Sequence, residues 1–328
     1  MLKLIPYPKY VEERIRKIET LAVSNIPDGL SHRLTKAFEK LPFDKNGLFL
    51  TVEIGSGKGD GYEIELLQSG IKIKTDAESG VYYAVKTLSQ IFENERVFET
   101  IIKDSPDFEV RGVYYDVTRG KIPKLEELKR LVDNLAGLKT NMLFLYVEHV
   151  FAFREAKEIV KRTGEITEAE LRELDRYCEE NFIELVPSIA TFGHMGEILD
   201  QEQYAHLRCN PNPPVNPNTL QNRALTIDPR KEESFELVKS LISQYAPIFK
   251  SNKFHQERLF FMQKKIENII NLIKEKDIKM VDFKMVDING QYRHVTIPAE
   301  NFSEDTMKSG IGFDASNYGY AVVEKSDM

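Results

Sequence analysis

The chain has 328 residues, of which 41% are hydrophobic, and its formal net charge is −7. This length suits two or three domains, and the hydrophobic fraction is enough to fill their cores. The acidic balance, without long runs of one charge sign, argues against a general nucleic-acid-binding protein. No apolar run is long enough to span a bilayer, and charges come too early in the N-terminus for a signal peptide. We therefore expect a cytoplasmic protein that contacts neither nucleic acid nor membrane.

The chain has two cysteines, Cys178 and Cys209, which fits a reducing compartment. Cys178 continues an apolar helix stripe formed by Leu171 and Leu174, so we expect it in the core. Cys209 lies near His206 in a loop, but a metal site needs more ligands than these two. We therefore expect no metal site and no cofactor.

Residues 1 to about 100 have the pattern of a small α+β domain. We expect a strand over 48–54 and a β-hairpin from 62–67 and 71–75, joined by Gln68-Ser69-Gly70. A helix is expected over 78–92, because its apolar residues recur with helical spacing.

The next segment predicts a strand, a helix and a second strand. Residues 110–117 are rich in β-branched and aromatic side chains, and 141–147 is a nearly continuous apolar run. Two strands joined by a helix of this length form a right-handed unit with parallel strands. The helix is indicated by Pro123 at its start and by apolar residues with a 3.6-residue period: Leu125, Leu128, Leu131, Val132 and Leu135.

The same alternation continues to about residue 255. Thr167 and Glu170 predict a capping box, followed by a helix and then a strand over 183–189. A further helix is expected over 232–249, and residues 252–255 have the pattern of a strand that is just beginning. Residues 101–255 thus predict an α/β fold with about four parallel strands, which is part of a (β/α)8 barrel.

Polar residues gather where these strands are expected to end. Asp116 and Arg119 follow the first strand, Glu148 and His149 follow the second, and His194 lies in the loop after the third. In parallel α/β folds this edge is where binding sites form, so these five residues are our candidate substrate-binding residues. The alternative for Asp116 and Arg119 is a structural ion pair, and for the two histidines it is packing.

Beyond residue 255 the pattern changes. Residues 256–276 predict a long, charged amphipathic helix. Two strands, over 280–288 and 291–297, flank Asn289-Gly290, which is the strongest short-range signal of a β-hairpin. A glycine-containing motif then covers 310–316.

Six segments of the first 255 residues carry a resemblance to a known family: Asp104–Phe108, Arg111–Gly120, Asn141–His149 and Phe192–Met195, together with Ile5–Pro8 and Gly80–Leu88. Through them this part of the chain resembles glycoside hydrolase family 20, the β-N-acetylhexosaminidases. That resemblance implies that Arg119 binds the hydroxyls of a terminal sugar and that His194 lies in the same pocket. Glu148 and His149 would lie where the second strand meets the site.

One part of the family pattern is absent. The family uses the acetamido group of its substrate as nucleophile, and a neighbouring Asp-Glu pair follows the fourth strand. In this chain the strand ends at His255 and is followed by Gln256-Glu257-Arg258. Glu257 has no neighbouring Asp and opens the helix pattern. We therefore assign no catalytic residue and expect an inactive enzyme.

Three later segments carry a second resemblance: Ile278–Lys284, His294–Pro298 and Gly310–Ser316. Through them residues 262–328 resemble a different family, the N-terminal β-grasp domain of glutamine synthetase. That resemblance implies a homo-oligomer in which Asp314 reaches the active site of an adjacent subunit. The catalytic domain of that family is not in this chain, so glutamine synthesis is not expected.

Together these patterns divide the chain into residues 1–100, 101–255 and 256–328. We interpret it as a fusion of two incomplete genes joined near residues 255–262, with half a barrel that leaves apolar surface uncovered. Three functions stay open. The first is a β-N-acetylhexosaminidase, or its inactive remnant, acting on N-acetylhexosamine-containing glycans. The second is an oligomerising module, and the third is a chimera without function.

Overall fold

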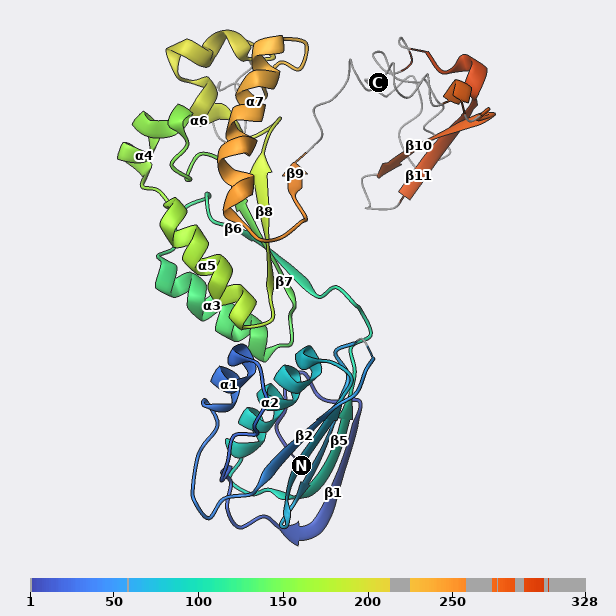
Figure 1. Ribbon diagram of the computed structural model, residues 1–328. Helices are drawn as coiled ribbons and strands as arrows, with labels where there is room; N and C mark the ends of the chain where they lie inside the picture. The colour runs from blue at the N-terminus through green and yellow to red at the C-terminus, as the bar shows by residue number, and fades with distance from the viewer. Residues whose placement is uncertain are drawn as a thin grey trace, which may run out of the picture. The chain divides into compact units, whose positions relative to one another are not determined.

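The computed structural model (Figure 1) divides the chain into two compact units, Met1–Arg258 and Leu259–Met328. The residues that the structure describes are 2–57, 59–212, 225–257, 273–275, 277–286, 292–303 and 306. Within these residues, no helix combines the length and the apolar character that crossing a membrane requires.

The first unit begins with a five-stranded sheet in the order β1-β5-β3-β4-β2. β3 and β4 form the predicted hairpin, and β2 lies parallel to β4 while the other neighbours are antiparallel. The strands alternate between buried and partly exposed residues, which is typical of a sheet with one covered face. The strand bounds are β1 Tyr10–Lys17, β2 Leu50–Ile54, β3 Tyr62–Leu67, β4 Gly70–Thr75 and β5 Phe98–Asp104.

Helix α2 (Glu78–Phe92) covers this sheet, as Figure 1 shows, and has the predicted bounds. Its apolar side chains are buried, including Val81, Val85 and Leu88. They pack where the sheet presents Ile64 and Ile73, because a helix stripe and one face of a sheet must each exclude water. The shorter helix α1 (His32–Phe38) contacts α2.

Strand β1 is not among the predicted elements. Its sequence, YVEERIRK, is mostly charged and its side chains are largely exposed. It nevertheless pairs with β5 at the edge of the sheet. Charged residues are common on edge strands, because they oppose pairing with a further chain.

A second, parallel sheet follows in the order β6-β7-β8-β9. β6 and β7 are the two strands of the predicted unit, and their parallel pairing is confirmed. Residues of β7 and β8 are buried almost throughout, as expected of strands with both faces covered. The strand bounds are β6 Gly112–Asp116, β7 Met142–Val147, β8 Glu184–Ala190 and β9 His255–Glu257.

Helices connect these strands and contribute apolar side chains to the core. α5 begins with the predicted capping box, in which Thr167 accepts a hydrogen bond from the Glu170 N–H and the Glu170 side chain accepts one from the Thr167 N–H. The core prediction for Cys178 is also confirmed, since burial is complete and raises the pKa of its thiol. The α-helices are α3 Leu125–Gly137, α4 Lys157–Thr163, α5 Glu168–Glu180, α6 Gly196–Leu199 and α7 Glu232–Tyr245. The 3-10 helices are η1 Arg154–Ala156, η2 Glu202–Leu207, η3 Ala246–Ile248 and, in the second unit, η4 Ala299–Asn301.

Two predicted helix boundaries differ from the structure. The helix predicted over 232–249 ends as an α-helix at Tyr245 and continues as η3, because Pro247 cannot donate to the helical ladder. The helix predicted from residue 256 was wrong at its start: Gln256 and Glu257 belong to β9 and pair in parallel with Ile189 and Ala190. Pairing with the edge of β8 outweighs local helix propensity here. Residues 258–272 lie outside the described part.

In the second unit, β10 (Met280–Val286) and β11 (Tyr292–Pro298) pair antiparallel, which confirms the predicted hairpin. The Asn289-Gly290 turn lies outside the described residues, and so do Asp314 and its motif over 310–316. The predicted three-part division of the chain stays a prediction. Strand β5 runs through the proposed boundary at residue 100.

The two sheets of the first unit are joined by a buried ion pair. The Lys139 ammonium, in the turn between α3 and β7, lies 2.7 Å from the Asp104 carboxylate at the end of β5. The side chains are only 10% and 13% exposed, respectively. Lys139 also donates to the Tyr62 hydroxyl at 2.8 Å, and Tyr62 is within 2.7 Å of the Thr87 hydroxyl. These contacts link the core of the five-stranded sheet to the end of the parallel sheet at which β7 begins.

Candidate functional site

The candidate site lies where the parallel strands end. Asp116 is the last residue of β6 and is in register with Tyr146 of β7. Tyr146 is in turn in register with Ser188 of β8, and Ser188 with His255 of β9. These four residues therefore form one layer across the sheet, and residues that follow them reach its carboxyl edge.

Arg119 is held at this edge by two carboxylates from neighbouring strands. One guanidinium nitrogen donates to Asp116, and the other lies 3.0 Å from Oε1 of Glu148. The guanidinium also lies over the ring of Tyr146, 5.5 Å from its centroid. The Arg119 side chain is 53% exposed, so it keeps donors for a ligand while its orientation is fixed.

The backbone between these residues is held by the same side chains. Asp116 Oδ1 accepts hydrogen bonds from the N–H groups of Thr118 and Arg119, at 2.8 and 3.3 Å. The hydroxyl of Thr118 accepts from the N–H of Glu148 at 3.0 Å. The loop after β6 is thus tied to the end of β7, which fixes the position of Arg119.

Glu148 is the buried acid of the cluster, with a side chain only 12% exposed. Burial raises its pKa, while Arg119, His194 and the Tyr146 hydroxyl oppose that shift. The hydroxyl donates to Oε1 at 3.2 Å, and Nδ1 of His194 lies 3.9 Å from the same oxygen. Glu148 therefore links Arg119, in the loop after β6, with His194, in the loop after β8.

His194 is exposed and adopts a left-handed backbone conformation, with φ of 56°. Such a conformation is uncommon outside glycine and often marks a functional loop. Glu148, His149 and His194 line one small recess together with Ala190 and Met195. All five predicted residues are therefore at one end of the sheet: Asp116, Arg119, Glu148 and His194 through direct contacts, and His149 through the shared recess.

A second cluster, formed by Tyr114, Ser188 and His255, was not among the predicted site residues. Ser188 lies 2.7 Å from Nδ1 of His255 and 3.0 Å from the Tyr114 hydroxyl. The rings of Tyr114 and His255 meet edge to face at 5.4 Å. Tyr114 is 49% exposed, which agrees with an inner face that is only partly covered. The two-residue alternation along the strands was the signal that groups these residues on one face.

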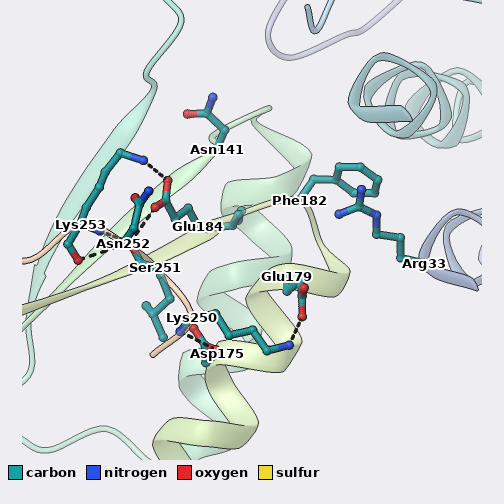
Figure 2. A pocket seen from close by; sticks show the side chains of 12 residues that line it. Arg33, Asn141, Asp175, Glu179, Phe182, Glu184, Lys250, Ser251, Asn252 and Lys253 are labelled. Atoms are coloured by element: carbon teal, nitrogen blue, oxygen red, sulfur yellow. Dashed lines mark hydrogen bonds and ion pairs between the residues drawn. The ribbon is translucent and has the colours of Figure 1, made fainter. Parts of the chain in front are cut away.

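A larger pocket, of about 550 Å3, lies away from the candidate site (Figure 2). Its walls come from the N-terminal ends of β7 and β8 and from the turn before β9, including Asn141, Glu184 and Lys253. Arg33 of α1 reaches it and stacks on Phe182 at 4.0 Å. No residue of this pocket is among the predicted site residues.

Two family models match the chain. The model described as glycosyl hydrolase family 20, catalytic domain, matches residues 108–282, which is more than half of the chain. The model described as glutamine synthetase, beta-Grasp domain, matches residues 277–328. Both resemblances noted in the sequence are thereby confirmed.

Individual relatives agree with both matches. A β-hexosaminidase of Akkermansia muciniphila is 26% identical over 227 residues, covering 62% of this chain and 45% of its own length. A glutamine synthetase of Vibrio cholerae is 36% identical over 64 residues, covering 19% of this chain and 14% of its own.

Among solved structures, a β-hexosaminidase of Streptomyces plicatus in complex with GlcNAc superposes with a TM-score of 0.62 at 21% identity. The superposition covers 83% of this chain and 62% of that one. At this identity the likeness shows an α/β fold in common. The chain spans about half the length of the β-hexosaminidases that it matches. On the evidence of the family model, the chain belongs to glycosyl hydrolase family 20.

Proposed function

We propose that the carboxyl edge of the parallel sheet binds a terminal N-acetylhexosamine residue of a glycan. The observation that carries the proposal is the half-exposed guanidinium of Arg119, oriented by Asp116 and Glu148. Charged, pre-oriented donors of this kind suit the hydroxyl groups of a sugar. His149 and His194 would complete the pocket.

We further propose that the site binds without cleaving. The chemistry of the family needs an acid next to a carboxylate that orients the acetamide, and His255 is followed here by Gln256-Glu257-Arg258. The four parallel strands would correspond to the first four strands of a (β/α)8 barrel. This correspondence rests on their order, their parallel pairing and the helices that connect them.

Binding and cleavage are tested on the same sample. We expect N-acetylglucosamine to shift NMR signals of residues at the strand ends in a saturable manner, and glucose to do so much more weakly. We expect no release of nitrophenol from 4-nitrophenyl N-acetyl-β-glucosaminide. Absence of any saturable shift would contradict the binding proposal, whereas steady turnover would contradict the proposed lack of cleavage.

Hydrolysis is the second candidate, because of the position of Glu257. Its backbone is in register with Ala190, which lines the recess that also contains Glu148 and His194. An acid at that position could protonate a glycosidic oxygen. If turnover is seen, its loss in Glu257→Gln with retained sugar binding would assign that role to Glu257.

For the second unit we propose a role in self-association. The support is the match to the glutamine synthetase β-grasp model and the β10-β11 hairpin. We expect light scattering after size exclusion to give a mass above that of one chain. A clean monomer at high protein concentration would remove this proposal.

A further inference from the structure

A second pocket, of about 310 Å3, lies where α1, α2 and the end of α5 meet. Its size is at the lower end of the range for small-ligand sites. Basic residues outnumber acidic ones in its lining, which includes Arg33, Lys36, Lys40 and Lys86 against Glu39 and Glu180. This composition favours a negatively charged occupant.

Three of the four basic residues lie near carboxylates. Arg33 lies 2.7 Å from Glu78, and Lys36 lies 2.9 Å from Glu180. Lys40 has a longer contact, 3.7 Å from Asp133. The positive charge with the least compensation is therefore that of Lys86, followed by that of Lys40.

Lys86 is the residue whose charge has no close counterpart. Its ammonium lies over the ring of Tyr82 at 4.9 Å, and no ion pair connects it to the described part of the chain. The acid that acts on its pKa is Asp133 of α3. That carboxylate is shared, because Lys40 lies 3.7 Å away and the Tyr177 hydroxyl is 2.9 Å from each of its oxygens.

The electrostatics agree with this geometry. Burial and, to a smaller extent, the positive charge of Lys40 lower the pKa of Lys86 to about 8, while Asp133 partly opposes the shift. A half-buried cation beside another cation is unfavourable unless an anion accompanies it. An oxyanion between the two ammonium groups would supply the missing charge.

We propose that this pocket binds a dianionic oxyanion, a sulfate or phosphate group, through the ammonium groups of Lys86 and Lys40. The group is either free or part of a small phosphorylated or sulfated sugar, for which the volume leaves room. The site is separate from the sugar-binding edge, and its argument does not depend on the proposed function.

The larger pocket in Figure 2 is a weaker candidate for an anion. Its two lysines are paired within the pocket wall, Lys250 with Glu179 and Lys253 with Glu184 at 2.6 Å, and Arg33 pairs with Glu78. The buried Asp175 adds a negative charge there. An anion entering it would meet carboxylates that already hold the available ammonium groups.

The test is calorimetric titration of the full chain with sodium sulfate, with sodium chloride at equal ionic strength as reference. We expect saturable sulfate binding that is at least about tenfold weaker in Lys86→Met, since a charge-assisted hydrogen bond is lost. Lys239→Met is the matched control, because Lys239 is an exposed helical lysine on α7. Unchanged binding in Lys86→Met, or no saturable binding in the wild type, would overturn the proposal.

The wild type alone gives a second readout, which does not depend on the variant folding. Sulfate stays dianionic, whereas the Lys86 ammonium loses its proton above the lowered pKa of about 8. Affinity should therefore fall at least about fivefold between about pH 7 and about pH 9.5, and equal affinities would contradict a role for Lys86. The titratable groups around Lys86 are Arg33 and Lys36 of α1, Glu39 and Lys40 just after α1, Asp133 of α3, Tyr177 and Glu180 of α5, and Tyr82 of its own helix. Raised pKa values keep the two tyrosines protonated over this range.

A third arm distinguishes the sources of the oxyanion. Glucose 6-phosphate is titrated beside inorganic phosphate and sulfate. Tighter binding of the sugar phosphate would support the site and indicate a phosphorylated sugar as ligand. Equal binding would support a site for the free oxyanion.

Discussion

Replacing Lys139 with alanine should lower the free energy of unfolding of the first unit by about 3 kcal/mol. The substitution leaves the carboxylate of Asp104 buried without its cation, and an uncompensated buried charge is strongly destabilising. We expect the lower end of the usual range, because the hydroxyl of Tyr62 and the N–H of Ser105 still donate to Asp104. Chemical denaturation followed by circular dichroism measures the change.

Two further variants separate the buried pair from lysine loss in general. Lys103 lies on the same strand as Asp104, and Lys103→Ala removes an exposed ion pair with Glu63. This variant should lower the free energy of unfolding by less than about 1 kcal/mol. The double variant Lys139→Met with Asp104→Asn removes both buried charges and should recover part of the loss. If Lys139→Ala is no more destabilising than Lys103→Ala, the pair does not stabilise the junction between the sheets.

Arg119→Ala should weaken binding of N-acetylglucosamine by about tenfold to a hundredfold, which is the loss of one or two charge-assisted hydrogen bonds. Arg119→Lys should not restore it, because one ammonium cannot contact Asp116, Glu148 and a sugar with the geometry of a guanidinium fork. NMR titration with the sugar gives the dissociation constants.

Arg130→Ala is the control for charge, since Arg130 is exposed on α3 and pairs only locally with Glu127. A change in the pKa of Glu148 is also expected. Because Arg119 opposes the upward shift of the Glu148 pKa, Arg119→Ala should raise that pKa further. If Arg119→Ala binds the sugar as the wild type does, then Arg119 is a structural ion-pair residue rather than a ligand of the sugar.

Much of the candidate site could be predicted because its geometry follows from local pattern. Asp116 ends one apolar run and Glu148 follows the next, so parallel pairing alone brings them to one edge. Their contacts with Arg119 then need only a short loop. The cluster of Tyr114, Ser188 and His255 also follows from parallel pairing, but it was not predicted because no sequence motif marks these residues.

Other features had no signal in the sequence. Lys139 lies between the predicted helix and the apolar run over 141–147, and no pattern in the sequence pairs it with Asp104; only the packing of two sheets makes them partners. Glu257 begins an amphipathic pattern that favours a helix, yet it forms a strand because it pairs with the edge of β8. Strand β1 was not predicted because its sequence is mostly charged and shows no clear alternation of apolar and polar residues. An edge strand with exposed side chains does not require that alternation.

The buried contact between Lys139 and Asp104 also bears on how such a chain can change during evolution. This ion pair lies at the end of the parallel sheet opposite to Arg119. The residues that stabilise the fold and those proposed to bind the sugar therefore lie at opposite ends of the same strands. Substitutions at sites so far apart usually have additive effects. Substitutions at the sugar-binding edge can therefore change or abolish ligand binding, while the Lys139–Asp104 ion pair continues to stabilise the fold of the unit.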